Sequence, residues 1–328
     1  LLFFNGLREV DLRLPGFGHH IPALLAAERF AQMCVGGSQQ LACALARTVR
    51  ETGGNIELNA APRQICVEAG RVTGVETESG DLLRAGLVVS SLNPQQTFLE
   101  LLDARYVPQQ WKQQAEKYHY NLLAPLFALY VNLDAPPHYQ AAERAPHLDE
   151  ALMVILGLDR VEQFHEILLH HEKGTFPPSV MWGSCPTRFD PSQAPPGKHT
   201  AFMWEKLPYK LHAEAGHWDQ LKRDHGQKLL KTWQQYAPNL AASDGDWFTQ
   251  SPLDTERTLV NMRYGDLLVG SFDRGQIGYH RPFPGAGHYR GHLPGLYLCG
   301  SSCHPGGNIT GLPGYNCAQV LRADLRLN

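Results

Sequence analysis

Residues 296–321, LYLCGSSCHPGGNITGLPGYNCAQVL, carry the pattern in this sequence that points most directly to chemistry. Five glycines and two prolines lie between a strand-like apolar run and a helix-like tail. Glycine is used where a backbone takes φ > 0 or comes very close to another group. A loop of this kind before a helix presents bare N–H groups to a ligand with negative charge. The pattern therefore predicts a ligand-binding loop.

Three other chemistries fit less well. Cys299, Cys303 and His304 could be pictured around zinc, but no fourth ligand stands at a recognisable spacing, so buried thiols are favoured over a metal. Ser301 lacks the G-x-S-x-G context of a hydrolytic nucleophile. The full dinucleotide fingerprint G-x-G-x-x-G is absent, and the partial matches at 16–21 and 285–291 predict turns.

The most regular elements that could position this loop lie in residues 36–89. A helical stripe that includes Leu41, Leu45 and Val49 ends at two glycines, 53 and 54. Residues 55–59 predict a short strand. Residues 63–91 predict a hairpin with turns at Gly70 and Gly80, followed by another strand. This mixture of helix and strand predicts an α/β layer.

Residues 94–255 have a different character, with frequent Trp, Pro, His and Tyr and long irregular stretches such as 186–200. Within them, 213–237 predicts an amphipathic helix that Pro238 ends. The strand–glycine loop–helix pattern returns from Leu293 onward. A layer that is interrupted by a large insertion and then resumed predicts two domains that are discontinuous in sequence.

Composition narrows the class of protein. The 29 basic and 32 acidic residues give a net charge of −3 without a long basic run, which argues against nucleic acid as a partner. Seven cysteines with irregular spacing and no C-x-x-C favour reduced thiols in a cytoplasmic protein. The apolar run 122–131 is about half of the ~20 residues that cross a bilayer. The start of the sequence does not resemble a signal peptide.

The stretch 293–321 closely resembles the C-terminal flavin motif of FAD-dependent oxidoreductases related to phytoene desaturase. The resemblance covers most of 34–328 in the right order. It includes the helix–strand–hairpin of 36–81, the strand and turn of 88–98, and the segments 190–200, 236–240, 251–257 and 281–300. Two features depart from the family. The N-terminal Rossmann βαβ unit is not in this sequence, and Asn308 replaces the third glycine of H-P-G-G-G.

This resemblance implies an α/β fold with a Rossmann-like FAD-binding domain of the glutathione-reductase type, N-terminally incomplete and interrupted by an α+β substrate or cap domain. The expected parts are a cap-side segment 1–33, FAD-binding parts at 34–93 and 286–328, and the substrate or cap domain at 94–285. Because the pyrophosphate-binding half is missing, the chain starting at Leu1 is expected to be colourless and inactive by itself.

The resemblance also implies which residues bind FAD. The helix start at Gly311, Leu312, Pro313 and Gly314 would face the flavin ring, where its N–H groups stabilise the charge of the reduced form. Gly300 and Ser301 would face the ribityl and pyrophosphate, while Pro62 and Ile65 flank the adenine and Ser90 and Ser91 lie nearby. The remaining expected contacts are Ser302, His304, Pro305, Gly306, Gly307, Asn308 and Asn316.

The implied activity is desaturation, saturation or isomerisation of a large apolar, isoprenoid-like substrate by hydride transfer at the flavin. Two alternatives stay open: a flavin amine oxidase, and a non-catalytic relative that binds a partner. Tyr279, His280 and Arg281 are the only candidates for catalysis, with packing as the favoured role of each. A cytoplasmic protein is expected, with peripheral membrane contact and homo-oligomerisation left open.

Overall fold

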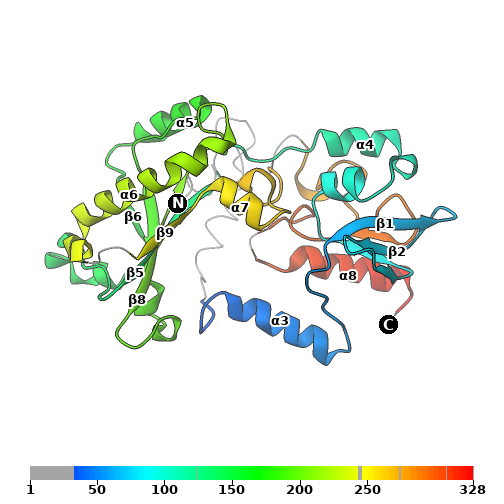
Figure 1. Ribbon diagram of the computed structural model, residues 1–328, viewed down its shortest axis with the longest axis horizontal. Coiled ribbons are helices and arrows are strands. Elements are labelled where there is room, and N and C mark those ends of the chain that lie inside the picture. The colour runs from blue at the N-terminus through cyan, green and yellow to red at the C-terminus, as the bar shows by residue number, and fades with distance from the viewer. Residues whose placement is uncertain (1–32, 124, 243–245, 273–274, 308, 328) are drawn as a thin grey trace. The chain divides into compact units, whose positions relative to one another are not determined.

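The computed structural model describes residues 33–327 except 124, 243–245, 273–274 and 308. Within them the chain forms two compact units, shown in Figure 1. The five-stranded unit comprises Leu122–Thr258 and the described part of Leu1–Ile56. The glycine-loop unit comprises Glu57–Asn121 and Leu259–Asn328. Each unit is therefore discontinuous in sequence.

The glycine-loop unit holds two small sheets. Strands β1, β2 and β3 form an antiparallel sheet, whereas β4 and β10 pair in parallel although some 200 residues separate them. The helix α8 packs on β10, because Cys317 of the helix shares one core with Leu296 and Leu298 of the strand. The bounds are β1 Pro62–Glu68, β2 Arg71–Thr77, β3 Leu82–Arg84, β4 Val88–Ser90, α4 Gln109–Glu116, β10 Leu296–Leu298 and α8 Leu312–Asp324.

The five-stranded unit is built around an antiparallel sheet with the order β6-β7-β8-β5-β9. The long helix α6 covers one face, where Trp218 stacks on Phe127 of β5 at 5.4 Å between ring centroids. The bounds are α3 Gln39–Glu51, β5 Leu126–Leu133, β6 Val154–Leu156, α5 Gln163–Lys173, β7 Met181–Ser184, β8 His199–Lys206, α6 Trp218–Tyr236, β9 Trp247–Gln250 and α7 Pro252–Thr258.

A buried polar pair lies under α6. His225 Nε2 is 2.6 Å from Glu205 Oε2, and both side chains are almost completely inaccessible to solvent. The Phe176 ring stacks on the imidazole at 4.2 Å. Because a buried carboxylate is costly unless it is hydrogen-bonded, this contact fixes how α6 sits on β8.

Most of the predicted elements are confirmed. The helical stripe from Leu41 to Val49 is α3, the hairpin is β1–β2, and the helix predicted at 213–237 is α6, which begins at Trp218. The turn predicted at 285–291 is also present, whereas 16–21 lies outside the described residues. The strand predicted at 55–59 is wrong, because no described strand pairs with this segment and Leu58 is 78% exposed.

The compact units have other bounds than the predicted domains. The chain changes unit after residues 56, 121 and 258, whereas boundaries were expected after 33, 93 and 285. Packing is the reason: Phe98 and Phe283, both assigned to the insertion, lie in the core beside β10. The predicted segment 1–33 lies outside the described residues except for Met33. Among the described helices, none combines the length and apolar character that a membrane span requires.

Candidate cofactor site

The carboxyl ends of the parallel strands β4 and β10 lie together. The Cys299 N–H donates to the Ser90 carbonyl at 2.8 Å, so the two chain segments remain paired beyond the last residue of β10. Gly300 follows with φ +83°, and a Cβ there would lie only 2.5 Å from the Ser91 carbonyl oxygen. Only glycine fits between these strand ends. The structure thus brings together Ser90, Ser91 and Gly300, as predicted for a ligand site at the end of an α/β sheet.

The inner side of this turn is closed by side chains. Ser302 and Cys303 are each 2% exposed, and the Ser90 hydroxyl is hydrogen-bonded to the Thr97 hydroxyl at 2.8 Å. The Ser302 and Ser90 hydroxyls therefore face the interior. In contrast, the N–H groups of Ser301 and Ser302 have no acceptor within the described residues. The backbone rather than the serine side chains is what the turn can offer to a ligand.

Gly306 and Gly307 lie against a wall formed by residues 268–272. A Cβ at Gly306 would come within 2.3 Å of the Phe272 ring, and one at Gly307 within 3.1 Å of the Leu268 side chain. The preceding His304 is exposed, and its carbonyl accepts a hydrogen bond from the Tyr289 hydroxyl at 2.8 Å. The loop is therefore held from behind by packing. Asn308 lies outside the described residues.

The start of α8 is open. Gly311 is its N-cap residue with φ +69°, and Pro313 occupies the first turn. A Cβ at Gly311 or Gly314 would meet no atom within 4 Å. The N–H groups in the first turn of a helix have no acceptor within the helix, and the helix dipole is positive there.

The side chains around this helix start are also exposed. Ile309 is 85% exposed and Tyr315 is 61% exposed, while Leu312, in the first turn, is 45% exposed. The Leu312 N–H donates to the Thr310 hydroxyl at 3.3 Å, and Pro313 has no N–H, so Gly311 and Gly314 supply the donors at this helix start. Their N–H groups, with the open apolar rim around them, fit a flat ring that gains negative charge on reduction. The residues present are thus compatible with the flavin end of FAD.

Asn316, one of the expected FAD contacts, is hydrogen-bonded within the protein. Its side-chain amide donates to the Tyr289 hydroxyl at 2.9 Å, and this hydroxyl in turn donates to the His304 carbonyl. Asn316 and Tyr289 together tie α8 to the glycine loop. Tyr289 was not singled out from the sequence, although it belongs to a stretch that resembles the family.

The two residues expected at the adenine differ in their surroundings. Pro62 begins β1 and is exposed, so it remains accessible to a ligand. Ile65 is 2% exposed and lies in the core with Leu296 and Leu298, and its N–H donates to the Leu101 carbonyl at 2.7 Å. The Ile65 side chain therefore packs behind β10 and does not present a surface for a ring.

The three candidates for catalysis are separated by their environments. Tyr279 is 71% exposed, and its ring is tilted against the imidazole of His280 with 4.0 Å between ring centroids. Arg281 is completely buried, and its guanidinium donates to backbone carbonyls. A guanidinium held in this way does not reach a substrate, which favours a structural role for Arg281.

The thiols of this region behave as packing groups. Burial raises the pKa of Cys303 to about 12 and that of Cys317 to about 11, and burial also raises the pKa of Cys299. All three are free cysteines. Within the described part of the chain, no group of three or more His, Cys, Asp or Glu side chains could hold a metal ion. Such protonated, enclosed thiols are unreactive.

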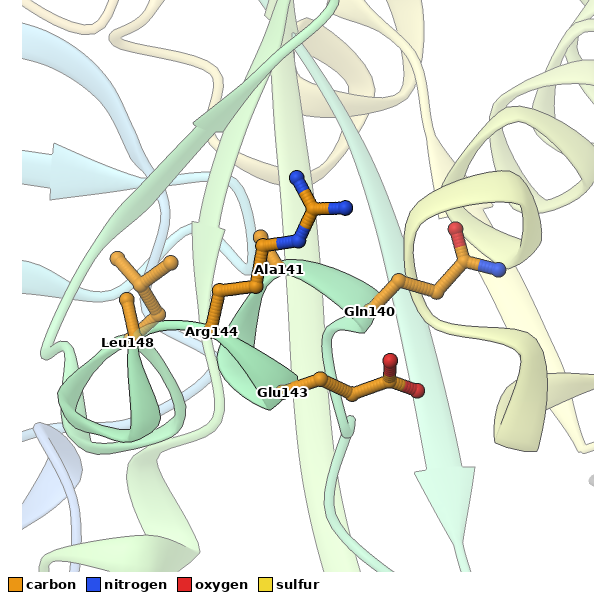
Figure 2. Close-up of a pocket in the computed structure, with 6 residues that line it drawn as sticks. Gln140, Ala141, Glu143, Arg144 and Leu148 are labelled. Carbon is orange, nitrogen blue, oxygen red and sulfur yellow. The ribbon is translucent and has the colours of Figure 1, made fainter.

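The five-stranded unit carries a surface hollow of about 530 Å³, shown in Figure 2. The side chains of Gln140, Glu143 and Arg144 extend from short helical turns around it. All of its lining residues come from the single segment 140–148. Ligand sites usually gather polar groups from several elements, so this hollow is a weaker candidate than the strand ends and α8.

Comparison with known proteins gives a family and several relatives. A model described as flavin containing amine oxidoreductase matches residues 2–314. The pyridine nucleotide-disulfide oxidoreductase domain-containing protein 2 of Rattus norvegicus is 31% identical over 95% of this chain and 55% of its own length. A limonene dehydrogenase component from Castellaniella defragrans is 27% identical over 100% of this chain and 62% of its own.

A neurosporene-forming phytoene desaturase of Cereibacter sphaeroides is 23% identical over 85% of this chain and 51% of its own length. The chain spans about half the length of the curated relatives it matches. Among solved structures, a putrescine oxidase variant superposes with a TM-score of 0.50 at 11% identity, over 88% of this chain and 53% of that one. This likeness concerns the fold alone.

Proposed function

Because this chain belongs to the family of flavin-containing amine oxidoreductases, we propose that the protein of which it is part oxidises or reduces a large apolar substrate at a bound FAD. The family match confirms the predicted resemblance to FAD-dependent oxidoreductases, which include phytoene desaturases among the relatives, and it confirms FAD as the cofactor. FAD, when bound, supplies the hydride transfer, while the protein orients the reactants and excludes water.

The chain's own part in this chemistry follows from the open helix start. The N–H groups of Gly311 and Gly314 are suited to the part of the reduced ring where negative charge concentrates, and their preorganisation costs nothing at the moment of transfer. The turn at Gly300 and Ser301 offers backbone N–H groups to the phosphate-bearing part. No side chain in these segments is needed as an acid or a base.

The observation that carries the substrate class is the face of the five-stranded sheet opposite α6. Phe202 pairs with Tyr130, and Tyr130 pairs with Phe248, so the three rings stand in one row. Trp204 and Trp182 pair in the next row. These rings are in contact: Tyr130 stacks on Phe248 at 4.8 Å, and Phe202 lies 4.4 Å from Trp204.

We call Tyr130, Trp182, Phe202, Trp204 and Phe248 the aromatic face. Aromatic side chains bind extended apolar molecules through large contact areas. Two relatives are named for limonene and phytoene, which are isoprenoid hydrocarbons. Together these observations support a neutral isoprenoid-like substrate, with desaturation, saturation and isomerisation as the candidate reactions.

The aromatic face also bears on the amine oxidase alternative. Lys206 Nζ lies 5.9 Å from the centroid of the Trp182 ring, so the charged side chain that adjoins these rings is basic. None of the five residues of the face is acidic, so the face itself supplies no carboxylate to pair with a protonated amine. This composition favours a neutral substrate over an amine.

Two neighbouring residues provide a matched test. Phe248 is 60% exposed on the aromatic face, whereas Trp247 points to the opposite face, where it contacts Gly226 of α6. In the complete protein, Phe248→Ala should raise KM for an isoprenoid about tenfold, since one aromatic contact contributes on the order of 1–2 kcal/mol, and should leave FAD affinity unchanged.

Trp247→Ala is the control, and it should lower stability without this selective change in KM. The readout is bleaching of the flavin band under anaerobic conditions by a polyene or by a primary amine. Reduction by amines alone would support the amine oxidase alternative. A non-catalytic protein would be supported if FAD binds, neither class reduces it, and a polyene neither reoxidises the chemically reduced flavin nor is isomerised.

A further inference from the structure

The buried guanidinium of Arg281 connects two separate segments of the glycine-loop unit. Arg281 Nη1 donates to the carbonyls of Ser271 and Gln276 at 3.0 and 3.2 Å, and Nη2 donates to those of Leu268 and Gly270 at 3.0 and 3.1 Å. Nε and Nη2 both reach the Ser301 carbonyl, at 3.3 and 2.9 Å. Five carbonyls from both segments thus converge on one fully buried cation.

The first of these segments is the wall behind the glycine loop. The Arg281 guanidinium lies 4.2 Å from the centroid of the Phe272 ring, and the same ring would be struck by a Cβ at Gly306. Leu268 meets Gly307 in the same way. A shift of Arg281 would therefore displace Phe272 and Leu268, and these side chains would in turn displace Gly306 and Gly307.

Charge balance explains why a cation is tolerated here. Asp266 is 2% exposed and accepts hydrogen bonds from the N–H groups of Asn121, Leu268 and Gly270. Burial raises the pKa of Asp266, and the nearby positive charge of Arg281 opposes that rise. Carbonyl dipoles and a carboxylate thus surround the guanidinium, as a buried charge requires.

The second segment is the turn after β10. Because a trans peptide is planar, its carbonyl and its N–H point in opposite directions. The bonds to Arg281 turn the Ser301 carbonyl inward, so the Ser302 N–H faces the other way. That N–H and the one before it have no acceptor among the described residues. The guanidinium therefore fixes the orientation of the donors that this turn can offer.

We propose that Arg281 is a positioning residue of the cofactor site, which acts through Ser301 and Phe272 to hold the N–H groups of Ser301 and Ser302, and the loop as far as Gly307, where FAD requires them. The proposal rests on the proposed function, because it takes FAD as the ligand of this loop. Arginine suits the task, since its planar fork reaches several acceptors at fixed angles, whereas lysine supplies the same charge with at most three donors and no fork.

Two substitutions in the complete protein separate geometry from charge. Arg281→Lys keeps the charge and should raise the Kd for FAD about tenfold to a hundredfold, because several charge-assisted hydrogen bonds to the carbonyls are lost. Arg281→Met removes the charge as well, and the reduction potential of any flavin still bound should become more negative than in Arg281→Lys. Phe272→Leu, which leaves the charge in place, should raise the Kd several-fold.

Arg290→Lys is the matched control. Arg290 forms two hydrogen bonds with Asp324, at 2.8 and 2.7 Å, on the surface of the same unit. Its substitution should leave the Kd, the visible spectrum and the reduction potential unchanged. Circular dichroism of each variant verifies that the fold is retained.

The measurements are FAD titration, the visible spectrum and the reduction potential of the bound flavin. The proposal is wrong if Arg281→Lys and Phe272→Leu both bind FAD with the affinity and potential of the wild-type protein. It is also wrong if Arg290→Lys weakens binding as much as Arg281→Lys. A wild-type protein that binds no FAD would instead overturn the proposed function itself.

Discussion

The glycine loop and the aromatic face, the two surfaces proposed to bind ligands, are built in opposite ways. In the loop the useful groups are backbone N–H donors, and the side chains of Ser302 and Cys303 are turned inward. On the aromatic face the useful groups are side chains, and the backbone is engaged in the ladder between β5, β8 and β9. A backbone surface needs special φ values and close approach, whereas a side-chain surface needs only the correct register.

This difference decides how each region responds to change. A substitution in the loop alters the path of the chain itself, so one residue can destroy the whole site. A substitution on the aromatic face removes one contact among several and leaves the neighbouring rings in place. Loss of function should therefore be abrupt in the first region and graded in the second.

The largest effect is expected at Gly311. Gly311→Val in the complete protein should abolish retention of FAD, because φ is +69° and a β-branched side chain there is strained and obstructs the open helix start. The absorbance ratio of flavin to protein after gel filtration measures retention. Gly216→Val is the control, since Gly216 is exposed and an added Cβ meets no atom within 4 Å. Full retention of FAD in Gly311→Val would contradict the expectation that a single substitution in the glycine loop destroys the site.

A second prediction concerns acid stability of the five-stranded unit. Burial lowers the pKa of His171 to about 4 from 6.5, and the positive charges of His170 and Lys206 add to this. The pKa of His171 is lower in the folded state than in the unfolded state. Above pH 6.5 the imidazole is therefore neutral in both states, and no stability is lost. As the pH falls from 6.5 to 4, the unfolded state alone takes up a proton, and the loss should reach about 3 kcal/mol.

Tryptophan fluorescence during urea unfolding can follow this loss, because five of the six tryptophans belong to the five-stranded unit. His171→Leu should flatten the dependence of the midpoint on pH between 6.5 and 4. His165→Gln, on the exposed side of α5, should leave it as in the wild-type protein. An unchanged slope in His171→Leu would show that another group controls the acid response.

The smallest effect is expected at the contact that ties α8 to the loop. Tyr289→Phe removes the hydroxyl that joins the Asn316 amide to the His304 carbonyl, at a cost of about 1 kcal/mol. The Kd for FAD should rise several-fold, because the helix start and the loop are no longer held together. Asn316→Ala should reproduce this rise. An effect of Asn316→Ala alone would mean that the amide contacts FAD directly, as the sequence predicts.

The sequence indicated the loop better than it indicated the sheet. Gly300 follows a strand closely and Gly311 precedes a helix directly, because the backbone has positive φ at both positions. Glycines at such positions can be recognised in the sequence. The family resemblance and FAD followed from that pattern. Strand 55–59 failed because an isolated alternation of apolar residues does not reveal whether a partner strand exists.

The sequence by itself therefore determined local elements: the hairpin β1–β2, the helix α6, and the strand–loop–helix from Leu296 to Asp324. The tertiary structure alone decided that Tyr130, Phe202 and Phe248 meet in one row, because three strands far apart in sequence must first align in register. It likewise decided that Arg281 is enclosed by carbonyls rather than free for catalysis. Burial and pairing depend on the whole fold, and no local pattern of residues encodes them.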